Sequence, residues 1–291
     1  KLAESKHLPL IHPFDDPDVI AGQGTIGMEI HRQTSGAIDA VFVPVGGGGL
    51  IAGIAAYLKS VSPEIRIVGV EPEDAASMHA ALAAGAPVTL KEVGTFAEGV
   101  AVRRVGDETF RLCQKWVDDI VLVSNDEICA AVQDIFEATR AVVEPAGALA
   151  LAGLKRFVAE QGIHDQTLVA INSGANVNFD RLRHIADRAA IGEHREALFA
   201  VEIPERPGSF VKFCEAIGDR NLTEFNYRYH DSKAAQIFVG IELRNGDRER
   251  ELILNELGAA GYPVIDISQN ELAKLHIRYM VGGAAAALED E

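Results

Sequence analysis

The sequence has little that would hold a metal, a disulfide or a nucleic acid. Among its 291 residues only three are cysteines, and they form no Cys-x-x-Cys pair and have no histidine at metal-site spacing. Lysine and arginine number 27 against 43 acidic residues, so the net charge is −16 at pH 7. Such a surface repels a phosphate backbone, and no basic cluster offsets it. We therefore expect no metal centre, no nucleic-acid partner and a reducing, cytoplasmic compartment.

A membrane-spanning pattern is also missing. The uncharged stretch 41–58 is long enough to raise the question, but Pro44 and the glycines at 46–49 argue against one continuous helix there. The first residues contain no apolar core of a signal peptide. We expect no contact with a membrane. The chain does not begin with Met, and we expect it to be truncated at both ends.

Strand and helix patterns alternate over the first two thirds of the sequence. Strands are predicted at 40–45, 65–72, 119–124 and 167–170, and helices at 24–34, 50–61, 107–117, 125–140 and 145–162. Strands that are apolar on both faces and separated by helices predict an α/β domain with a largely parallel sheet. Ligands of such domains lie at the carboxyl ends of the strands.

Four consecutive glycines, Gly46 to Gly49, lie where the first predicted strand ends and a helix begins. Without Cβ atoms, their backbone N–H groups can converge on an anion at the positive end of the helix. A turn without a ligand would not require four glycines, since each costs backbone entropy on folding. We therefore predict a phosphate site. The spacings of the dinucleotide-binding loop and of the P-loop are absent, which disfavours those two classes of ligand.

Six segments, in order, resemble the biosynthetic threonine dehydratase family of fold-type II (tryptophan synthase β-like) pyridoxal phosphate enzymes. They read PFDDPDVIAGQGTIGMEI, VFVPVGGGGLIAGIA, VGVEPEDAASMHAAL, TFAEGVAVRRVGDETF, VVEPAGALALAG and NSGANVNFDRLR. The resemblance implies that residues 1–192 form a partial catalytic domain, with a parallel sheet, that binds pyridoxal 5'-phosphate.

The same resemblance assigns the site residues. The cofactor phosphate would be bound by Gly46, Gly47, Gly48, Gly49 and Leu50, and the pyridine nitrogen would face Ser173. Ser173 also follows a predicted strand, which places its hydroxyl at the ligand edge of the sheet, although a plain turn serine is the alternative. An uncharged hydroxyl makes the ring a weaker electron sink, which suits elimination more than transamination.

The family's chemistry begins with a lysine Schiff base in an S-x-K-x-R-G context. None of the nine lysines of this sequence lies in that context. The resemblance therefore implies that the Schiff-base lysine is not in this chain, and the catalytic residues stay unknown.

After residue 192 the pattern changes to strand, helix, strand, strand, helix, strand over 197–268, which predicts a βαββαβ ferredoxin-like sandwich. The run EIPERPGSF resembles the entry to an ACT-like regulatory subdomain, which we assign to 193–275, with a tail at 276–291. The resemblance implies that an amino-acid effector contacts Arg206, Gly208, Asn226 and Tyr227. A purely structural dimerisation domain is the alternative.

Taken whole, the resemblance implies dehydration and deamination of L-threonine to 2-oxobutanoate and ammonia in isoleucine biosynthesis. Isoleucine would inhibit the enzyme through the ACT-like region, valine would relieve the inhibition in some members, and the assembly would be a homo-oligomer, a tetramer. Two alternatives stay open. One is an L-serine dehydratase, and the other is a non-catalytic, amino-acid-binding regulatory fragment, because the Schiff-base lysine is missing.

Overall fold

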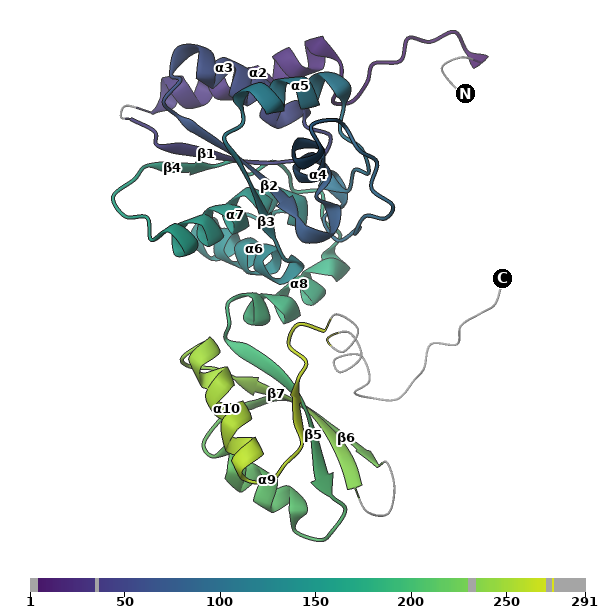
Figure 1. Ribbon diagram of the computed structural model, residues 1–291, viewed down its shortest axis with the longest axis vertical. Coiled ribbons are helices and arrows are strands. Elements are labelled where there is room, and N and C mark those ends of the chain that lie inside the picture. The colour runs from purple at the N-terminus through teal and green to yellow at the C-terminus, as the bar shows by residue number, and fades with distance from the viewer. Residues whose placement is uncertain (1–4, 35–36, 230–233, 271–273, 275–291) are drawn as a thin grey trace. The chain divides into compact units, whose positions relative to one another are not determined.

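The computed structural model describes residues 5–34, 37–229, 234–270 and 274. The chain divides into two compact units, Lys1–Gly192 and Glu193–Glu291, and each has its own sheet and core (Figure 1). The tail assigned to 276–291 lies outside the described residues.

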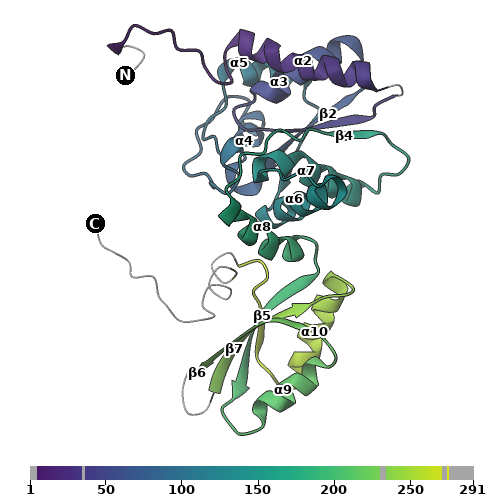
Figure 2. The same cartoon turned by 180° about the vertical axis from the view of Figure 1, so that it is seen from behind.

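Unit 1 is built on a four-stranded parallel sheet in the order β3-β2-β1-β4. Its strands are β1 (Ala40–Pro44), β2 (Arg66–Pro72), β3 (Asp119–Val123) and β4 (Leu168–Ala170). Every residue of β1 is buried, because helices cover both faces of the sheet (Figure 2). The prediction of an α/β domain with a parallel sheet is confirmed.

Helices fall into two groups, one on each face of this sheet (Figure 1). One group is α2 (Pro17–Gln33), α3 (Gly49–Val61) and α5 (Asp107–Trp116), and the other is α6 (Asn125–Thr139) and α7 (Pro145–Gln161), with α8 (Phe179–Gly192) packed on α6. Short segments at the sheet edge are α4 (Ser77–Ala84) and the 3₁₀ turns η1 (Glu73–Ala75) and η2 (Glu98–Val100). Side chains of neighbouring β1 residues point to opposite faces of the sheet and belong to different hydrophobic clusters. Val41 packs with α3 and α5, and Phe42 packs with α6 and α7.

Helix α2 begins at Pro17, whereas the sequence pattern predicted a start at Gly24. Asp16 caps it, since its carboxylate accepts the backbone N–H groups of Asp18 at 2.9 Å and of Val19 at 3.4 Å. Pro17 fits the first helical position, where no N–H is needed. The glycine that seemed to mark the start is a packing residue instead, because Gly24 lies against the backbone of α3.

Unit 2 is an antiparallel sheet in the order β6-β7-β5-β8 with two helices on one face (Figure 1). Its elements are β5 (Glu196–Pro204), α9 (Ser209–Ile217), β6 (Leu222–Tyr229), β7 (Ala234–Glu242), α10 (Asp247–Ala259) and β8 (Val264–Asp266). The core between sheet and helices contains Phe199, Phe213 and Leu257. This chain order is the predicted βαββαβ pattern, so the ferredoxin-like part of the fold prediction is also confirmed.

Candidate functional site

A hollow of about 360 Å³ lies at the carboxyl ends of β1 and β4. Its lining unites all six residues predicted to bind the cofactor, Gly46, Gly47, Gly48, Gly49, Leu50 and Ser173. The parallel pairing of β1 with β4 explains this, because the loops that follow two neighbouring parallel strands emerge at the same edge. Further lining comes from Phe14, Gly99 and Glu144.

The four residues Gly46 to Gly49, called here the glycine loop, have no room for side chains. A Cβ at Gly47 would lie 2.2 Å from the ring of Phe14, and one at Gly46 would lie 3.0 Å from the Cα of Val100. Gly48 has a φ of 94°, in the left-handed region that favours glycine. Tight packing against two neighbouring segments, together with one positive φ, therefore accounts for the glycine run.

The glycine loop leads directly into α3. Gly48 is the N-cap of this helix, and no side chain of the described residues caps its first-turn N–H groups. These N–H groups and the positive end of the helix dipole attract an anion. The glycine loop and this uncapped helix start both line the hollow, so the residues present fit the phosphate of pyridoxal phosphate.

Ser173 lines the same hollow from the segment after β4, and its Oγ is 3.5 Å from the carbonyl oxygen of Ala146. Glu144 lines this hollow too, although the sequence pattern did not predict it as a site residue. Glu144 is the N-cap residue of α7, its backbone N–H donates to the Gly174 carbonyl at 3.1 Å, and a Cβ at Gly174 would lie 2.0 Å from its Oε1. The available signal was a glutamate directly before a proline at a helix start, where a serine or aspartate is more usual.

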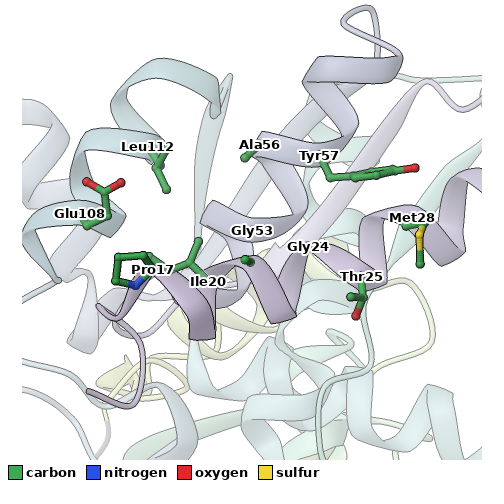
Figure 3. Close-up of a pocket in the computed structure, with 11 residues that line it drawn as sticks. Pro17, Ile20, Gly24, Thr25, Met28, Gly53, Ala56, Tyr57, Glu108 and Leu112 are labelled. Carbon is green, nitrogen blue, oxygen red and sulfur yellow. The ribbon is translucent and has the colours of Figure 1, made fainter. Parts of the chain in front are cut away.

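A second hollow, of about 430 Å³, lies between α2, α3 and α5 (Figure 3). It is mostly apolar, with Ile20, Met28, Tyr57 and Leu112 among its lining residues. Its one carboxylate, Glu108, is paired with Arg111 at 2.7 Å, and a hydrogen bond from that guanidinium lowers the pKa of Glu108. Its lining contains no run of glycines like that of the first hollow.

The residues predicted to bind an effector lie in unit 2, in the turn between β5 and α9 and on strand β6. Arg206 and Gly208 form the turn between β5 and α9, and the hydroxyl of Tyr227 on β6 donates a hydrogen bond to Glu205 in that turn. Neighbouring strand residues point to opposite faces, so Asn226 faces away from the side that Tyr227 shares with the helices. The effector role of these residues stays a prediction.

Other expected features can be compared with the described part of the chain. No lysine is among the residues that line the first hollow. Within the described ranges, no group of three or more His, Cys, Asp or Glu side chains could hold a metal ion. No helix there is both long and apolar enough to cross a membrane.

Family comparisons agree with this geometry. Residues 1–174 match the family model described as pyridoxal-phosphate dependent enzyme. This chain belongs to the pyridoxal-phosphate-dependent enzyme family. Residues 187–277 match a second model, the C-terminal regulatory domain of threonine dehydratase. The resemblance drawn from the six segments and the expected cofactor of the family are thereby confirmed.

Individual relatives of this family member carry more specific names. The chain is 57% identical to the biosynthetic L-threonine dehydratase of Pasteurella multocida and 56% identical to that of Escherichia coli, in each case over 97% of this chain and 55% of the relative. The solved structure of processed threonine deaminase isoform 2 from Solanum lycopersicum is 49% identical, with a TM-score of 0.63, over 65% of this chain and 55% of that one. The chain therefore spans about half the length of the curated relatives that it matches.

Proposed function

We propose that this chain supplies the cofactor-phosphate site and a regulatory unit of a biosynthetic L-threonine dehydratase, which converts L-threonine to 2-oxobutanoate and ammonia. The observation that carries the proposal is the glycine loop, which is closed to side chains and leads into the uncapped start of α3 in a hollow shared with Ser173. The names of relatives at 57% and 56% identity support threonine as the substrate.

Each residue of the site has a separate task in this proposal. The backbone N–H groups of Gly46 to Leu50 donate to the cofactor phosphate, and the hydroxyl of Ser173 contacts the ring nitrogen. Pyridoxal phosphate, when bound, supplies the electron sink for the charge left by loss of the substrate's α-proton. Because Ser173 is uncharged, it limits that sink and favours elimination. The lysine that anchors the cofactor in the family is not among the residues lining the hollow.

Unit 2 is proposed to bind isoleucine as inhibitor, with valine opposing it, through Arg206, Gly208, Asn226 and Tyr227. The match of 187–277 to the regulatory domain of threonine dehydratase supports an amino-acid effector. By the family resemblance we further propose a homotetramer and a cytoplasmic enzyme, although relatives in Saccharomyces cerevisiae and Solanum lycopersicum are named mitochondrial and chloroplastic.

Cofactor binding tests the proposed site directly. We expect the chain to bind pyridoxal 5'-phosphate at least about tenfold more tightly than pyridoxal, since only the former makes charge-assisted hydrogen bonds with the loop. Gly48→Ala should remove this preference, because its methyl group would lie 2.7 Å from Cε of Met78. Gly85→Ala is the matched control: Gly85 also has a positive φ, of 70°, but nothing lies within 4 Å of a Cβ there.

Equilibrium dialysis with absorbance detection measures both affinities, and circular dichroism confirms that each variant folds. Equal affinities for pyridoxal and its phosphate in the wild-type chain would contradict the phosphate site. Equal losses in Gly48→Ala and Gly85→Ala would show that backbone strain, rather than the clash of the new methyl group with Met78, causes the effect.

The substrate requires an enzyme that contains the anchoring lysine. We expect a chimera, in which this chain replaces the matching 283-residue part of the Escherichia coli relative, to release 2-oxobutanoate from L-threonine. Its kcat/KM should be higher for L-threonine than for L-serine, and L-isoleucine should inhibit it. A preference for L-serine would instead support the serine dehydratase alternative.

A further inference from the structure

We propose that Thr109 is a positioning residue for the glycine loop, because its buried hydroxyl holds the carbonyl of Gly47 and thereby fixes the direction of the loop's N–H groups. This inference rests on the proposed function of the loop as a phosphate cradle. Thr109 lies on α5, far from the loop in sequence, and does not line the hollow.

The contacts of the Gly47 carbonyl come from the start of α5. Thr109 is inaccessible to solvent, and its Oγ1 donates to the Gly47 oxygen at 2.7 Å. The backbone N–H of Gly106 donates to the same oxygen at 3.3 Å. The Gly106 carbonyl lies farther from the Thr109 hydroxyl, at 3.2 Å, so Gly47 is the nearer acceptor for its single proton. One carbonyl of the loop therefore accepts hydrogen bonds from two donors.

The hydrogen bonds to the Gly47 carbonyl also restrain the N–H group of the same peptide. The Gly47 carbonyl and the Gly48 N–H form one planar unit, so fixing the oxygen also fixes the direction of the N–H. Glycine allows the widest range of backbone rotation, and a run of glycines needs an outside restraint to keep one conformation. Thr109 lies at the right place for this, since a Cβ on Gly48 would be 2.9 Å from its Cβ and Oγ1.

Thr109 is itself held by the segment that packs against the loop. The Asp15 carboxylate accepts backbone N–H groups from the first turn of α5, at 3.0 Å from Asp107, 2.9 Å from Glu108 and 3.1 Å from Thr109. The residue before Asp15 is Phe14, whose ring packs against Gly47. The loop, α5 and residues 14–15 thus support one another.

The inference must be separated from the simpler role of any buried hydroxyl, which forms a hydrogen bond merely because an unpaired one is costly. Thr109→Val keeps the side-chain shape and removes the hydroxyl. Thr109→Ser keeps the hydroxyl and removes a methyl group. If the hydroxyl positions the loop, the two variants should differ at the cofactor site and not simply in stability.

We expect Thr109→Val to bind pyridoxal 5'-phosphate about tenfold more weakly while its affinity for pyridoxal is unchanged, and Thr109→Ser to keep the wild-type preference. Amide hydrogen exchange over 46–50, followed by mass spectrometry without cofactor, should be faster in Thr109→Val alone. Urea unfolding, monitored by the fluorescence of the single tryptophan, Trp116, records the stability of each variant. If Thr109→Val does not fold, Thr109→Ala replaces it as the variant without a hydroxyl and is compared with Thr109→Ser in the same measurements.

Unchanged exchange and unchanged cofactor preference in Thr109→Val would overturn the inference, as would equal behaviour of the valine and serine variants. The proposed function would fail separately if the wild-type chain bound the phosphorylated cofactor no better than pyridoxal while amide hydrogen exchange over 46–50 was still faster in Thr109→Val alone. In that case Thr109 holds the loop, but the loop is not a phosphate cradle.

Discussion

At the scale of single residues, Glu71 is a carboxylate enclosed by protein at the carboxyl end of β2. It accepts the backbone N–H groups of Met78 at 2.7 Å and His79 at 2.8 Å. Burial nevertheless raises its pKa from 4.5 to about 7, with these hydrogen bonds acting in the opposite direction. The folded chain therefore holds this proton more tightly than the unfolded chain does, and stability should fall as the pH rises from about 4.5 to about 7.

In the wild-type chain, the free energy of unfolding should decrease by on the order of 3 kcal/mol over this pH range, from the size of the pKa change. In Glu71→Gln most of this decrease should be absent. Urea unfolding at a series of pH values, monitored by Trp116 in the same unit, measures it. Glu92→Gln, at an exposed position, is the control and should keep the wild-type slope. If the slope survives in Glu71→Gln, another group is responsible for it.

The residues of the site differ in how far the sequence alone predicts them. The glycine loop and Ser173 could be predicted because a glycine run and a serine after a strand are visible in the sequence and match a family pattern. Thr109 and Glu144 also lie within segments that match the family pattern, but their residue types alone do not identify them as site residues. Thr109 occurs inside an amphipathic helix, and only the packing of α5 against the loop reveals its partner. Glu144 becomes a site residue only when β4 places the segment after it beside α7.

At the scale of elements, α6 is fixed by a reciprocal cap and by an ion pair to α7. The Ser124 side chain accepts the Glu127 N–H at 3.3 Å, and the Glu127 carboxylate accepts the Ser124 N–H at 2.8 Å. The same carboxylate binds Arg156 of α7, with its Oε2 2.6 Å from Nη2. Glu127 therefore joins two helices, whereas Ser124 serves only one.

We expect Ser124→Ala to lower the free energy of unfolding by about 1 kcal/mol, the usual cost of a lost N-cap. Glu127→Ala should cost more, because it also leaves Arg156 without its closest carboxylate. Urea unfolding of both variants, monitored by Trp116, compares the two costs. Equal costs would mean that the ion pair between α6 and α7 contributes nothing measurable.

The elements themselves were largely predictable, since the strands and most helices follow apolar periodicity. The start of α2 was not, because glycines at 22 and 24 weaken the helical pattern although Asp16 and Pro17 begin the helix earlier. The packing explains these glycines in part: a Cβ at Gly53 on α3 would lie 2.2 Å from the Ile20 carbonyl oxygen. Close approach of two helix backbones is a tertiary feature, which local propensity does not record.

At the scale of the whole molecule, the two units have separate cores, so each proposed ligand should stabilise the unit that binds it. A ligand at about 100 times its dissociation constant adds about 2.7 kcal/mol to the stability of the unit that binds it. We expect pyridoxal 5'-phosphate to raise the unfolding temperature reported by Trp116, and L-isoleucine to leave that transition unchanged while raising a second one.

Differential scanning calorimetry alongside Trp116 fluorescence distinguishes the two transitions, and L-alanine is a suitable control for L-isoleucine. If L-isoleucine shifted only the Trp116 transition, the effector would bind in unit 1, and the residues proposed in unit 2 would be the wrong ones.

The closed packing around the glycine loop also has a consequence for the gene. All glycine codons share their first two bases, so a single-base change at either position introduces a side chain or a stop codon, while a change at the third position is silent. Because the neighbours of Gly46 to Gly49 leave no space for a Cβ, variants of this gene should accumulate third-base changes across these codons and almost no others. Sequencing of functional variants from a random mutagenesis library would show this pattern directly.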